Sequence, residues 1–236
     1  MTRVGIIQSN YIPWKGYFDI IHDVDLFVFY DDVQYTKNDW RNRNRLKTEH
    51  GERWLTIPVG KRWSRRICDV ALPSNDWARD HWRKIEAAYR RAPYFEAYRA
   101  YFEEFYLRRQ WATLSEFNQA LVTGIARDLL GVTTPYVDSR AFPLTQSKGG
   151  RVVELLQHVG ASVYVSGPSA KAYITDEGFL AAGIAVEWKD YRGYPEYDQF
   201  HGPFVHAVTI LDLLFHTGPN APYYIWGWRQ ARRVAA

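Results

Sequence analysis

Side chains that could bind or activate a substrate are concentrated in a stretch near the N-terminus, residues 8–15. It combines the amides of Gln8 and Asn10, the phenol of Tyr11 and the ammonium of Lys15. Amides orient carbonyl and hydroxyl groups, and a lysine attracts phosphate. The stretch contains neither the Walker A nor the GxGxxG pattern. It is either a ligand-binding loop or a rigid aromatic turn, and the number of amides favours a ligand-binding loop.

A pair of carboxylates, Asp31 and Asp32, follows an apolar run. Paired carboxylates can hold Mg²⁺ together with substrate phosphates, or act as a general base. Consecutive residues of a strand point to opposite faces, so at most one of the two faces a pocket, and we favour Asp32. The alternative is a turn capped by an aspartate.

The positive charge of the chain is local. Residues 37–66 carry ten lysines and arginines but three acids, in a protein of net charge +4. Arg41, Arg43 and Arg45 alternate, so a strand would present them on one side, as a site for a planar anion requires. Trp40 and Asn42 add a stacking surface and an amide. The alternative is a solvated basic hairpin.

The elements that position these residues follow from the apolar pattern. Short apolar runs bounded by turn residues predict strands at residues 3–8, 26–30, 41–47, 54–59, 135–139, 162–166 and 184–188. Helical periodicity and capping residues predict helices at residues 16–22, 75–91, 93–109, 113–130, 150–158, 179–182 and 209–216. Asn75 and Asp176 are expected N-caps, Pro93 an expected first helical residue, and Thr113 forms a capping box with Glu116.

Strands that alternate with helices predict an α/β protein with a Rossmann-like, mainly parallel sheet. We expect a single domain over residues 1–236, with a helical segment at about residues 75–131 inserted into the sheet or packed beside it. Ligands of such sheets bind beyond the carboxyl ends of the strands. Gln8, Asp31 and the pair Ser166 and Gly167 all fall at such ends, which predicts a binding site there.

Length and composition exclude several classes of protein. The chain has 236 residues, 47% hydrophobic and 24% charged, as is typical of a globular protein. No apolar run approaches the roughly 18 residues of a membrane helix, and the N-terminus lacks a secretory signal. The single cysteine, Cys68, and the absence of paired histidine motifs predict neither a disulfide nor a metal site. We therefore expect a cytoplasmic protein with no membrane span.

Seven stretches of the sequence together resemble the WbqC-like protein family, which occurs largely in bacterial surface-polysaccharide and secondary-metabolite gene clusters. They are QSNYIPWKGYFD (8–19), DDVQYTKNDWRNRNRLK (31–47), WLTIPV (54–59), AYRRAPYF (88–95), YVSGPSAKAYI (164–174), YPEYDQ (194–199) and TILDLLFHTG (209–218). The family commonly has proline where Ser9 stands here. A fainter similarity links the chain to nucleotidylyltransferase-like folds such as that of pantothenate synthetase, whose HxGH motif is replaced here by Trp14-Lys15-Gly16-Tyr17.

The resemblance implies a transferase-like role but supplies no agreed catalytic residues, so we assign the polar residues of these stretches to a candidate site ourselves. The residues assigned to catalysis are Asp31, Asp32, Gln34 and Lys37. The residues assigned to donor or substrate binding are Gln8, Asn10, Tyr11, Lys15, Trp40, Asn42, Arg43, Ser166, Gly167, Tyr173, Tyr197 and Gln199.

We expect an enzyme that transfers an acyl or aminoacyl group to an amine of an amino sugar or small metabolite. The donor would be a nucleotide, a phosphopantetheine on a carrier protein or an aminoacyl-tRNA, with its phosphates held by the arginines and with Asp31 or Asp32 as general base. Three alternatives remain. They are an ATP- and Mg²⁺-dependent nucleotidyl transferase or amide-forming ligase, a module that binds nucleic acid or acidic glycan, and a glycosyltransferase.

Overall fold

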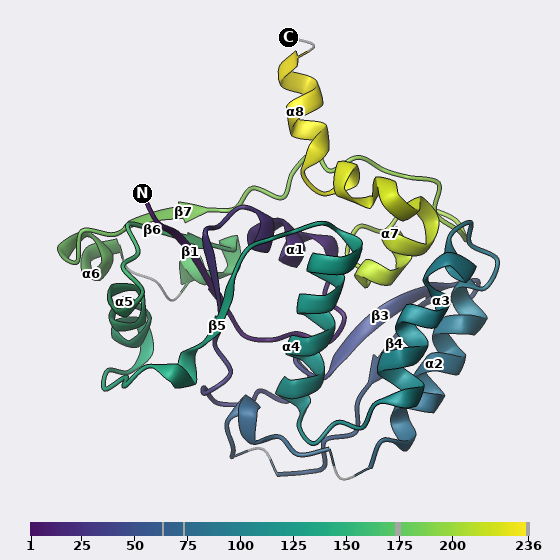
Figure 1. The fold of residues 1–236 in the computed structure, drawn as a ribbon, viewed down its shortest axis with the longest axis horizontal. Coiled ribbons are helices and arrows are strands. Elements are labelled where there is room, and N and C mark those ends of the chain that lie inside the picture. The colour runs from purple at the N-terminus through teal and green to yellow at the C-terminus, as the bar shows by residue number, and fades with distance from the viewer. Residues whose placement is uncertain (63, 73, 173–175, 235–236) are drawn as a thin grey trace.

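The computed structural model describes residues 1–236 except 63, 73, 173–175 and 235–236 (Figure 1). Five strands form one parallel sheet, which confirms the predicted fold class. Its order is β5 (Tyr136–Asp138), β2 (Leu26–Phe29), β1 (Arg3–Ile7), β6 (Val163–Ser166) and β7 (Ala185–Trp188). The chain order reverses direction between β1 and β6, which is where such sheets open a crevice at their carboxyl ends.

Helices cover both faces of the sheet because the strand residues alternate. Val4 and Ile6 of β1 pack with Leu155 of α5 (Lys148–His158) and Phe179 of α6 (Asp176–Ala181). On the other face lies α1 (Lys15–His22), which approaches β1 closely at Gly5. A Cβ atom at Gly5 would lie 3.1 Å from the Ile20 Cγ2 atom of α1. The glycine therefore permits this close contact between helix and sheet.

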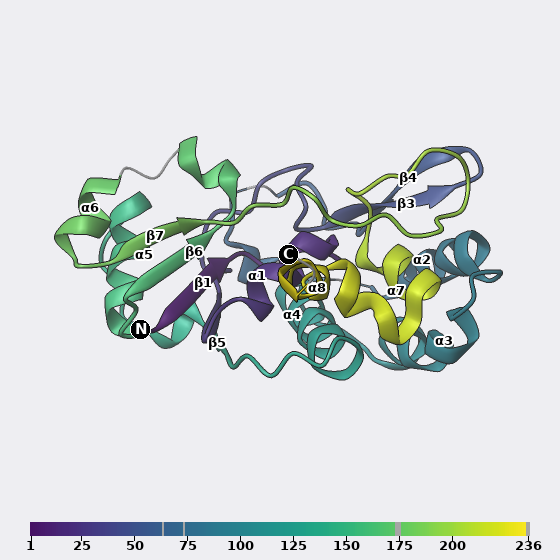
Figure 2. The same cartoon turned by 90° about the horizontal axis from the view of Figure 1, so that it is seen from above.

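Beyond α1 the core continues into a second group of elements. It comprises α2 (Asp76–Tyr89), α3 (Phe95–Glu103), α4 (Leu114–Gly124), α7 (Ile210–Thr217) and the hairpin of β3 (Arg43–Thr48) and β4 (Gly51–Thr56). Figures 1 and 2 show α2, α3 and the hairpin at the opposite end of the molecule from α5 and α6. One apolar cluster runs from α1 through all of these elements. This continuity supports our proposal that the chain is one domain.

Two helices end in π-helical turns, which the sequence pattern does not distinguish from α-helix. η2 (Glu104–Arg108) extends α3, and η3 (Ile125–Leu129) extends α4. The remaining helices are η1 (Ile67–Asp69), η4 (Ser139–Ala141), η5 (Pro168–Ala172), η6 (Gly218–Tyr224) and α8 (Gly227–Val234). π-turns are rare and often lie at functional sites, and both of these border the same groove, described below.

The capping predictions were partly wrong. The Thr113 side chain accepts from Glu116 N–H, as predicted, but the Glu116 carboxylate reaches back to Ala112 N–H instead of Thr113. Asn75 occupies the N-cap position of α2, as predicted, but its side chain makes no capping hydrogen bond because its amide is bonded to the backbone of Trp111. Pro93 precedes α3, which begins at Phe95. The Asp176 prediction depends partly on residues outside the described part.

The strand predicted at residues 54–59 is in fact Gly51–Thr56, and α8 was not predicted.

The segment from β7 onward is held to α1 by the carboxylate of Asp19, which is 0% exposed. Asp19 accepts hydrogen bonds from Tyr194 and from both terminal nitrogens of Arg229, and it forms an ion pair with Lys189 at 2.9 Å. A buried charge needs such partners to be tolerated. In the described part of the chain, no helix is long and apolar enough to cross a membrane.

Candidate active site at the strand ends

Asp31 lies at the end of β2 and connects three elements. One carboxylate oxygen accepts Ser9 N–H from the loop after β1 at 2.7 Å. The other accepts the Gln119 side-chain amide of α4 at 2.9 Å. The Asp31 side chain is fully buried. It thus fixes the β1 loop and α4 relative to the sheet.

Asp32 points the other way, as expected for consecutive residues. Its carboxylate accepts the Ser139 hydroxyl at 2.5 Å and pairs with Arg151 of α5. Its side chain is 8% exposed. The two carboxylates therefore contact different elements. Asp31 binds the loop after β1 and α4, whereas Asp32 binds η4 and α5.

Sequence reasoning missed a third carboxylate, Asp138, at the end of β5. Gln119 Nε2 donates to it at 3.0 Å, and Arg140 forms a two-pronged ion pair with it. Burial raises the pKa of Asp138, but the hydrogen bonds from Arg140 and Gln119 outweigh burial and hold this pKa below its usual value. Asp138 lies near the end of a predicted strand, residues 135–139, so the strand-end argument applied to Asp31 would have found it.

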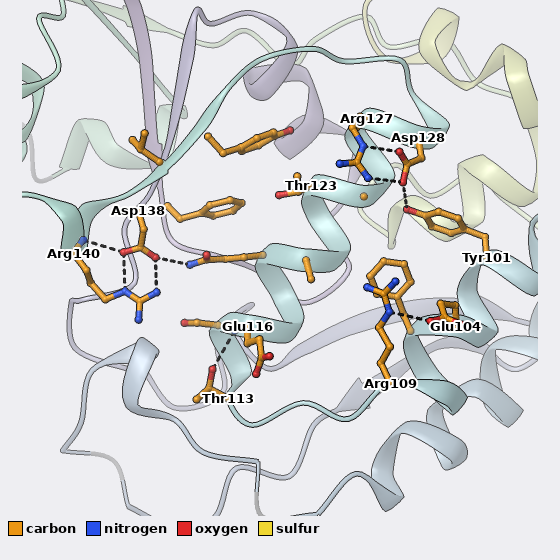
Figure 3. Close-up of a pocket in the computed structure, with 18 of the residues that line it drawn as sticks. Tyr101, Glu104, Arg109, Thr113, Glu116, Thr123, Arg127, Asp128, Asp138 and Arg140 are labelled. Atoms are coloured by element: carbon orange, nitrogen blue, oxygen red, sulfur yellow. Dashed lines mark hydrogen bonds and ion pairs between the residues drawn. The ribbon is translucent and has the colours of Figure 1, made fainter.

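A groove of about 1110 Å³ opens beside these carboxylates, between β5, α4 and the two π-turns (Figure 3). Phe29 and Tyr136, whose rings stack at 5.6 Å, line it together with Phe105 and Tyr101. Figure 3 shows Asp138 and Arg140 on one side of α4 and Tyr101, Glu104 and Arg109 on the other. The groove combines an aromatic lining with charged rims, as small-molecule sites commonly do.

A second hollow, of about 480 Å³, lies beside the chain that follows β2. It is lined by Gln34 and by three arginines, Arg62, Arg65 and Arg66. Arg66 pairs with Asp69 at 2.7 Å, whereas the Nε–H of Arg65 is buried and has no hydrogen-bond acceptor among the described residues. We call this site the arginine hollow.

One arginine of the hollow and one arginine of the groove both influence the pKa of the same thiol, that of Cys68. Burial raises the pKa of Cys68, while the charges of Arg66 in the hollow and Arg140 in the groove lower it. Cys68 N–H also donates to the backbone oxygen of Asp31 at 2.8 Å. Cys68 is therefore attached to the chain at the end of β2, next to residues of the arginine hollow.

The hairpin carries an exposed aromatic and cationic face. Arg43 and Arg45 lie on one side of β3, as the alternation predicted, and Trp54 of β4 is opposite Arg45. The Arg43 guanidinium is 4.3 Å from the centre of the Trp54 ring, and the Trp40 and Trp54 rings are 5.6 Å apart. Trp40 is 40% and Trp54 45% exposed.

The loop after β1 contributes to a small pocket beside this face. The pocket, of about 180 Å³, is lined by Asn10, Pro13, Trp14, Trp40, Asn44 and Ala207. Arg41 binds the Asn10 side-chain oxygen and lies 3.5 Å from the backbone oxygen of Gln8. Gln8 and Asn10 thus lie together with Trp40, but the volume suits only part of a ligand.

Tyr11 faces the core instead of this pocket. Its hydroxyl is 2.7 Å from His81 Nδ1 and 2.9 Å from the Tyr106 hydroxyl. Burial raises the pKa of Tyr11 well above its usual value and lowers the pKa of His81 to about 4. The two groups are therefore a neutral, buried pair that positions the β1 loop.

Lys15 begins α1 and is 3% exposed. Its ammonium lies over the rings of Tyr194, Tyr197 and Phe204, at 4.8–5.7 Å from their centres. Burial lowers the pKa of Lys15 to about 8, although the negative charges of Asp212 and Glu196 oppose this shift. Lys15 is thus enclosed by aromatic rings of the segment that precedes α7.

Tyr197 and Gln199 belong to the same enclosure. Both donate to one oxygen of Asp212 at 2.7 Å, while the other oxygen is buried and unpartnered within the described residues. The carbonyl of Gln199 accepts from Lys47 at 2.7 Å. These contacts hold the segment to α7 and to β3.

The other predicted residues are dispersed. Asn42 is buried and bonded to Tyr35 and Ile57, and the Ser166 hydroxyl bonds Tyr164. A Cβ atom at Gly167 would lie 3.3 Å from the Tyr191 hydroxyl. Lys37 is exposed in the turn before the hairpin. Tyr173 lies outside the described residues.

The strand ends therefore bring Asp31, Asp32 and Gln34 near one another, with Asp138, Arg140 and Gln119 added by the structure. Lys15, Tyr197 and Gln199 form a separate group under the 194–207 segment. Trp40 and Arg43 belong to the hairpin face. Among the described residues, no group of three or more His, Cys, Asp or Glu side chains could hold a metal ion.

Comparison with known proteins adds a family and one relative. The sequence model of a family described as "WbqC-like protein family" matches residues 8–224. The chain is 44% identical over 232 residues to "Uncharacterized protein Rv1507c" of Mycobacterium tuberculosis (strain ATCC 25618 / H37Rv), covering 98% of this chain and 100% of that protein. No solved structure matches the chain.

Proposed function

The chain belongs to the WbqC-like protein family, and from this premise we propose that it is a biosynthetic transferase. It would move an acyl or aminoacyl group from a phosphate-bearing donor to an amine. The observation that carries the proposal is the connection of the arginine hollow to the end of β2, where Gln34 forms a β-bridge with Arg66 and Cys68 N–H donates to the backbone oxygen of Asp31. An anion site next to proton acceptors, at the carboxyl edge of a parallel sheet, is the arrangement that such a transfer needs.

The donor phosphates would bind in the arginine hollow. Arg62 and Arg65 have no carboxylate partner among the described residues, and Arg66 shares its charge with Asp69. The unpartnered Nε–H of Arg65 supplies a buried donor. A charge-assisted hydrogen bond to phosphate contributes about 1.5–3 kcal/mol. Gln34 lines the same hollow and would orient the donor carbonyl.

Asp32 is the proposed general base. The oxygens of Asp31 are bonded to Ser9 and Gln119, and those of Asp32 to Ser139 and Arg151, but Asp31 is fully buried, which suits a positioning residue. Asp32 remains slightly exposed and interacts electrostatically with Arg66 of the arginine hollow. In the reaction, the amine nitrogen would attack the donor carbonyl and form the new C–N bond. The C–O or C–S bond to the donor would break, and the proton lost by the amine would pass through the carboxylate to the leaving oxygen or sulfur.

Calorimetry with a panel of donors tests this function. ATP, coenzyme A and aminoacylated tRNA represent the three donor classes. We expect one of them to bind, and Arg62→Ala to weaken that binding about tenfold or more. Arg83→Ala, which removes an exposed arginine paired with Asp80 on α2, is the matched control. Failure of all three donors to bind would contradict the proposal. Pyrophosphate release from ATP would favour the ligase or nucleotidyl transfer reaction instead.

The hairpin face favours a second candidate function, the binding of single-stranded nucleic acid. Exposed Trp40 and Trp54 beside Arg43 and Arg45 are the combination on which bases stack while cations hold the backbone. Fluorescence anisotropy with a labelled oligonucleotide tests it. Binding should weaken steeply as salt increases, and Trp54→Ala should reduce it more than Trp188→Ala. Equal effects of the two substitutions would exclude this face.

A further inference from the structure

We propose that the groove beside α4 binds a small polyhydroxylated molecule that carries one protonated amine. Binding itself needs no donor and does not depend on the function proposed above. The interpretation of this molecule as the acceptor of the transfer does rest on that proposed function. Three features of the groove support the assignment: its charge balance, its unpartnered hydroxyl groups and its aromatic lining.

The charges of the groove leave one carboxylate without a cation. Three arginines line it, and each is paired with an acid of the same groove: Arg109 with Glu104, Arg127 with Asp128 and Arg140 with Asp138. The fourth acid, Glu116, forms no ion pair within the described part of the chain. Only one of its oxygens is used, as the acceptor of Ala112 N–H at 2.9 Å. The lining is thus short of one positive charge, which an ammonium group would supply.

Two hydroxyl groups in the lining lack partners. Ser115 is 2% exposed, and its Oγ atom is buried with no hydrogen bond among the described residues. The hydroxyl of Tyr136 is also buried and has no hydrogen bond to any described residue. A buried polar group without a partner costs about 1–3 kcal/mol. Since a hydroxyl both donates and accepts, a ligand whose hydroxyls reach these two atoms would satisfy both.

The shape and lining of the groove fit a ring. Its volume of about 1110 Å³ exceeds what a monosaccharide needs and leaves room for a substituent. Ala120 keeps the α4 surface low, and the ring of Tyr136 offers a flat apolar contact for the C–H face of a sugar. Figure 3 shows Glu116 beside Thr113 at the start of α4, and Thr123 farther along the helix.

This placement also gives the amine a route to the reaction. Glu116 and Gln119 are both on α4, and Gln119 binds Asp31 and Asp138 at the strand ends. Arg140, which pairs with Asp138, lines the groove at these strand ends. Donor and acceptor would thus meet near the end of β2.

NMR titration with glucosamine, N-acetylglucosamine and glucose tests the inference at slightly acidic pH, where the free amine is charged. We expect glucosamine to bind about three- to fivefold more tightly than the two neutral sugars. Resonances of α4 and β5 residues should shift, and those of α5 and α6 should not. Absence of binding by glucosamine, or equal binding of the three sugars, would overturn the proposal.

Two conservative variants test whether the charge of Glu116 gives the preference for the amine. Glu116→Gln keeps the acceptor for Ala112 N–H but removes the charge, so it should abolish the preference for glucosamine and leave glucose binding unchanged. Glu96→Gln, on the exposed surface of α3, is its matched control and should retain the preference. A preference that survives Glu116→Gln would overturn the charge argument.

Ser115→Ala tests the hydroxyl. It should weaken all sugars about two- to tenfold, while the melting temperature of the free protein stays equal or increases, because the hydroxyl has no partner and alanine favours helix. A merely structural serine would instead show a lower melting temperature with unchanged sugar binding. These measurements involve no donor, so failure of the donor panel leaves them unaffected, and their failure leaves the donor site unaffected.

Discussion

Asp31 and Asp138, at the ends of neighbouring strands, are bound by the same nitrogen atom. Gln119 Nε2 donates to an oxygen of each, at 2.9 and 3.0 Å. One amide group of α4 therefore separates two carboxylates that would otherwise repel each other and fixes the wall shared by the sheet and the groove.

Substitution of this amide should destabilise the protein. In Gln119→Leu the oxygens of Asp31 and Asp138 lose their donor, and we expect the free energy of unfolding to fall by about 1–3 kcal/mol. Urea denaturation at neutral pH measures the change. Gln157→Leu on the exposed surface of α5 is the control and should change stability by less than about 0.5 kcal/mol. Equal effects of the two substitutions would contradict the role of Gln119.

Stability should depend on pH through His81. Burial lowers the pKa of His81 from 6.5 to about 4, so the unfolded chain binds a proton that the folded chain excludes between these pH values. The free energy of unfolding should therefore decrease as the pH falls from about 6.5 to about 4, by up to about 3 kcal/mol from this residue. Urea denaturation over this pH range should show a steeper decrease for the wild type than for His81→Gln. Parallel profiles would show that His81 titrates normally.

The pKa of Lys15 should respond to Asp212. The negative charge of Asp212 raises the pKa of Lys15 against the larger effect of burial, which brings it to about 8. Asp212→Asn should therefore lower the pKa of Lys15 further, as measured by an NMR titration of its ammonium group. Glu196→Gln should act in the same direction but less strongly, since Asp212 is the larger influence. A higher pKa of Lys15 in either variant would mean that these carboxylates do not stabilise its charged form.

Two glycines should respond oppositely to alanine. A Cβ atom at Gly16 would lie 2.3 Å from the indole of Trp14, whose ring is itself packed against Tyr191 and Tyr194. Gly16→Ala should therefore cost about 1–3 kcal/mol, despite the better helix propensity of alanine. Nothing lies within 4 Å of a Cβ atom at Gly149 in α5. Gly149→Ala should leave the melting temperature unchanged or raise it. A higher melting temperature for Gly16→Ala would mean that the Trp14 ring moves freely.

The sheet was predictable because its signals are local. Apolar runs such as residues 3–8 and 26–30 end at polar residues, and the alternation with helices implies parallel pairing. The same logic placed Asp31 and Asp32 on opposite sides of the β2 end and Arg43 and Arg45 on one side of β3. These conclusions depend only on periodicity and chain order.

The groove was not predictable, because its residues meet only through tertiary packing. Gln119 lies in the middle of a helix, and nothing in its sequence neighbourhood shows that its amide reaches two strands.

The burial of Tyr11 and Lys15 was not predictable either. Both are polar residues in a loop-like stretch, yet aromatic side chains of α2, η2 and the segment before α7 enclose them. Their burial depends on elements distant in the sequence.

The carboxylate of Asp19 has a consequence for synthesis on the ribosome. It belongs to the first helix of the chain, but Lys189, Tyr194 and Arg229, which neutralise and bond it, are made roughly two hundred residues later. At roughly 5–20 residues per second, that interval lasts about 10–40 s. Until then α1 cannot bury Asp19 against the sheet without an uncompensated charge. The sheet side of the nascent chain therefore stays open until the residues around Arg229 emerge, and the native fold closes late in translation.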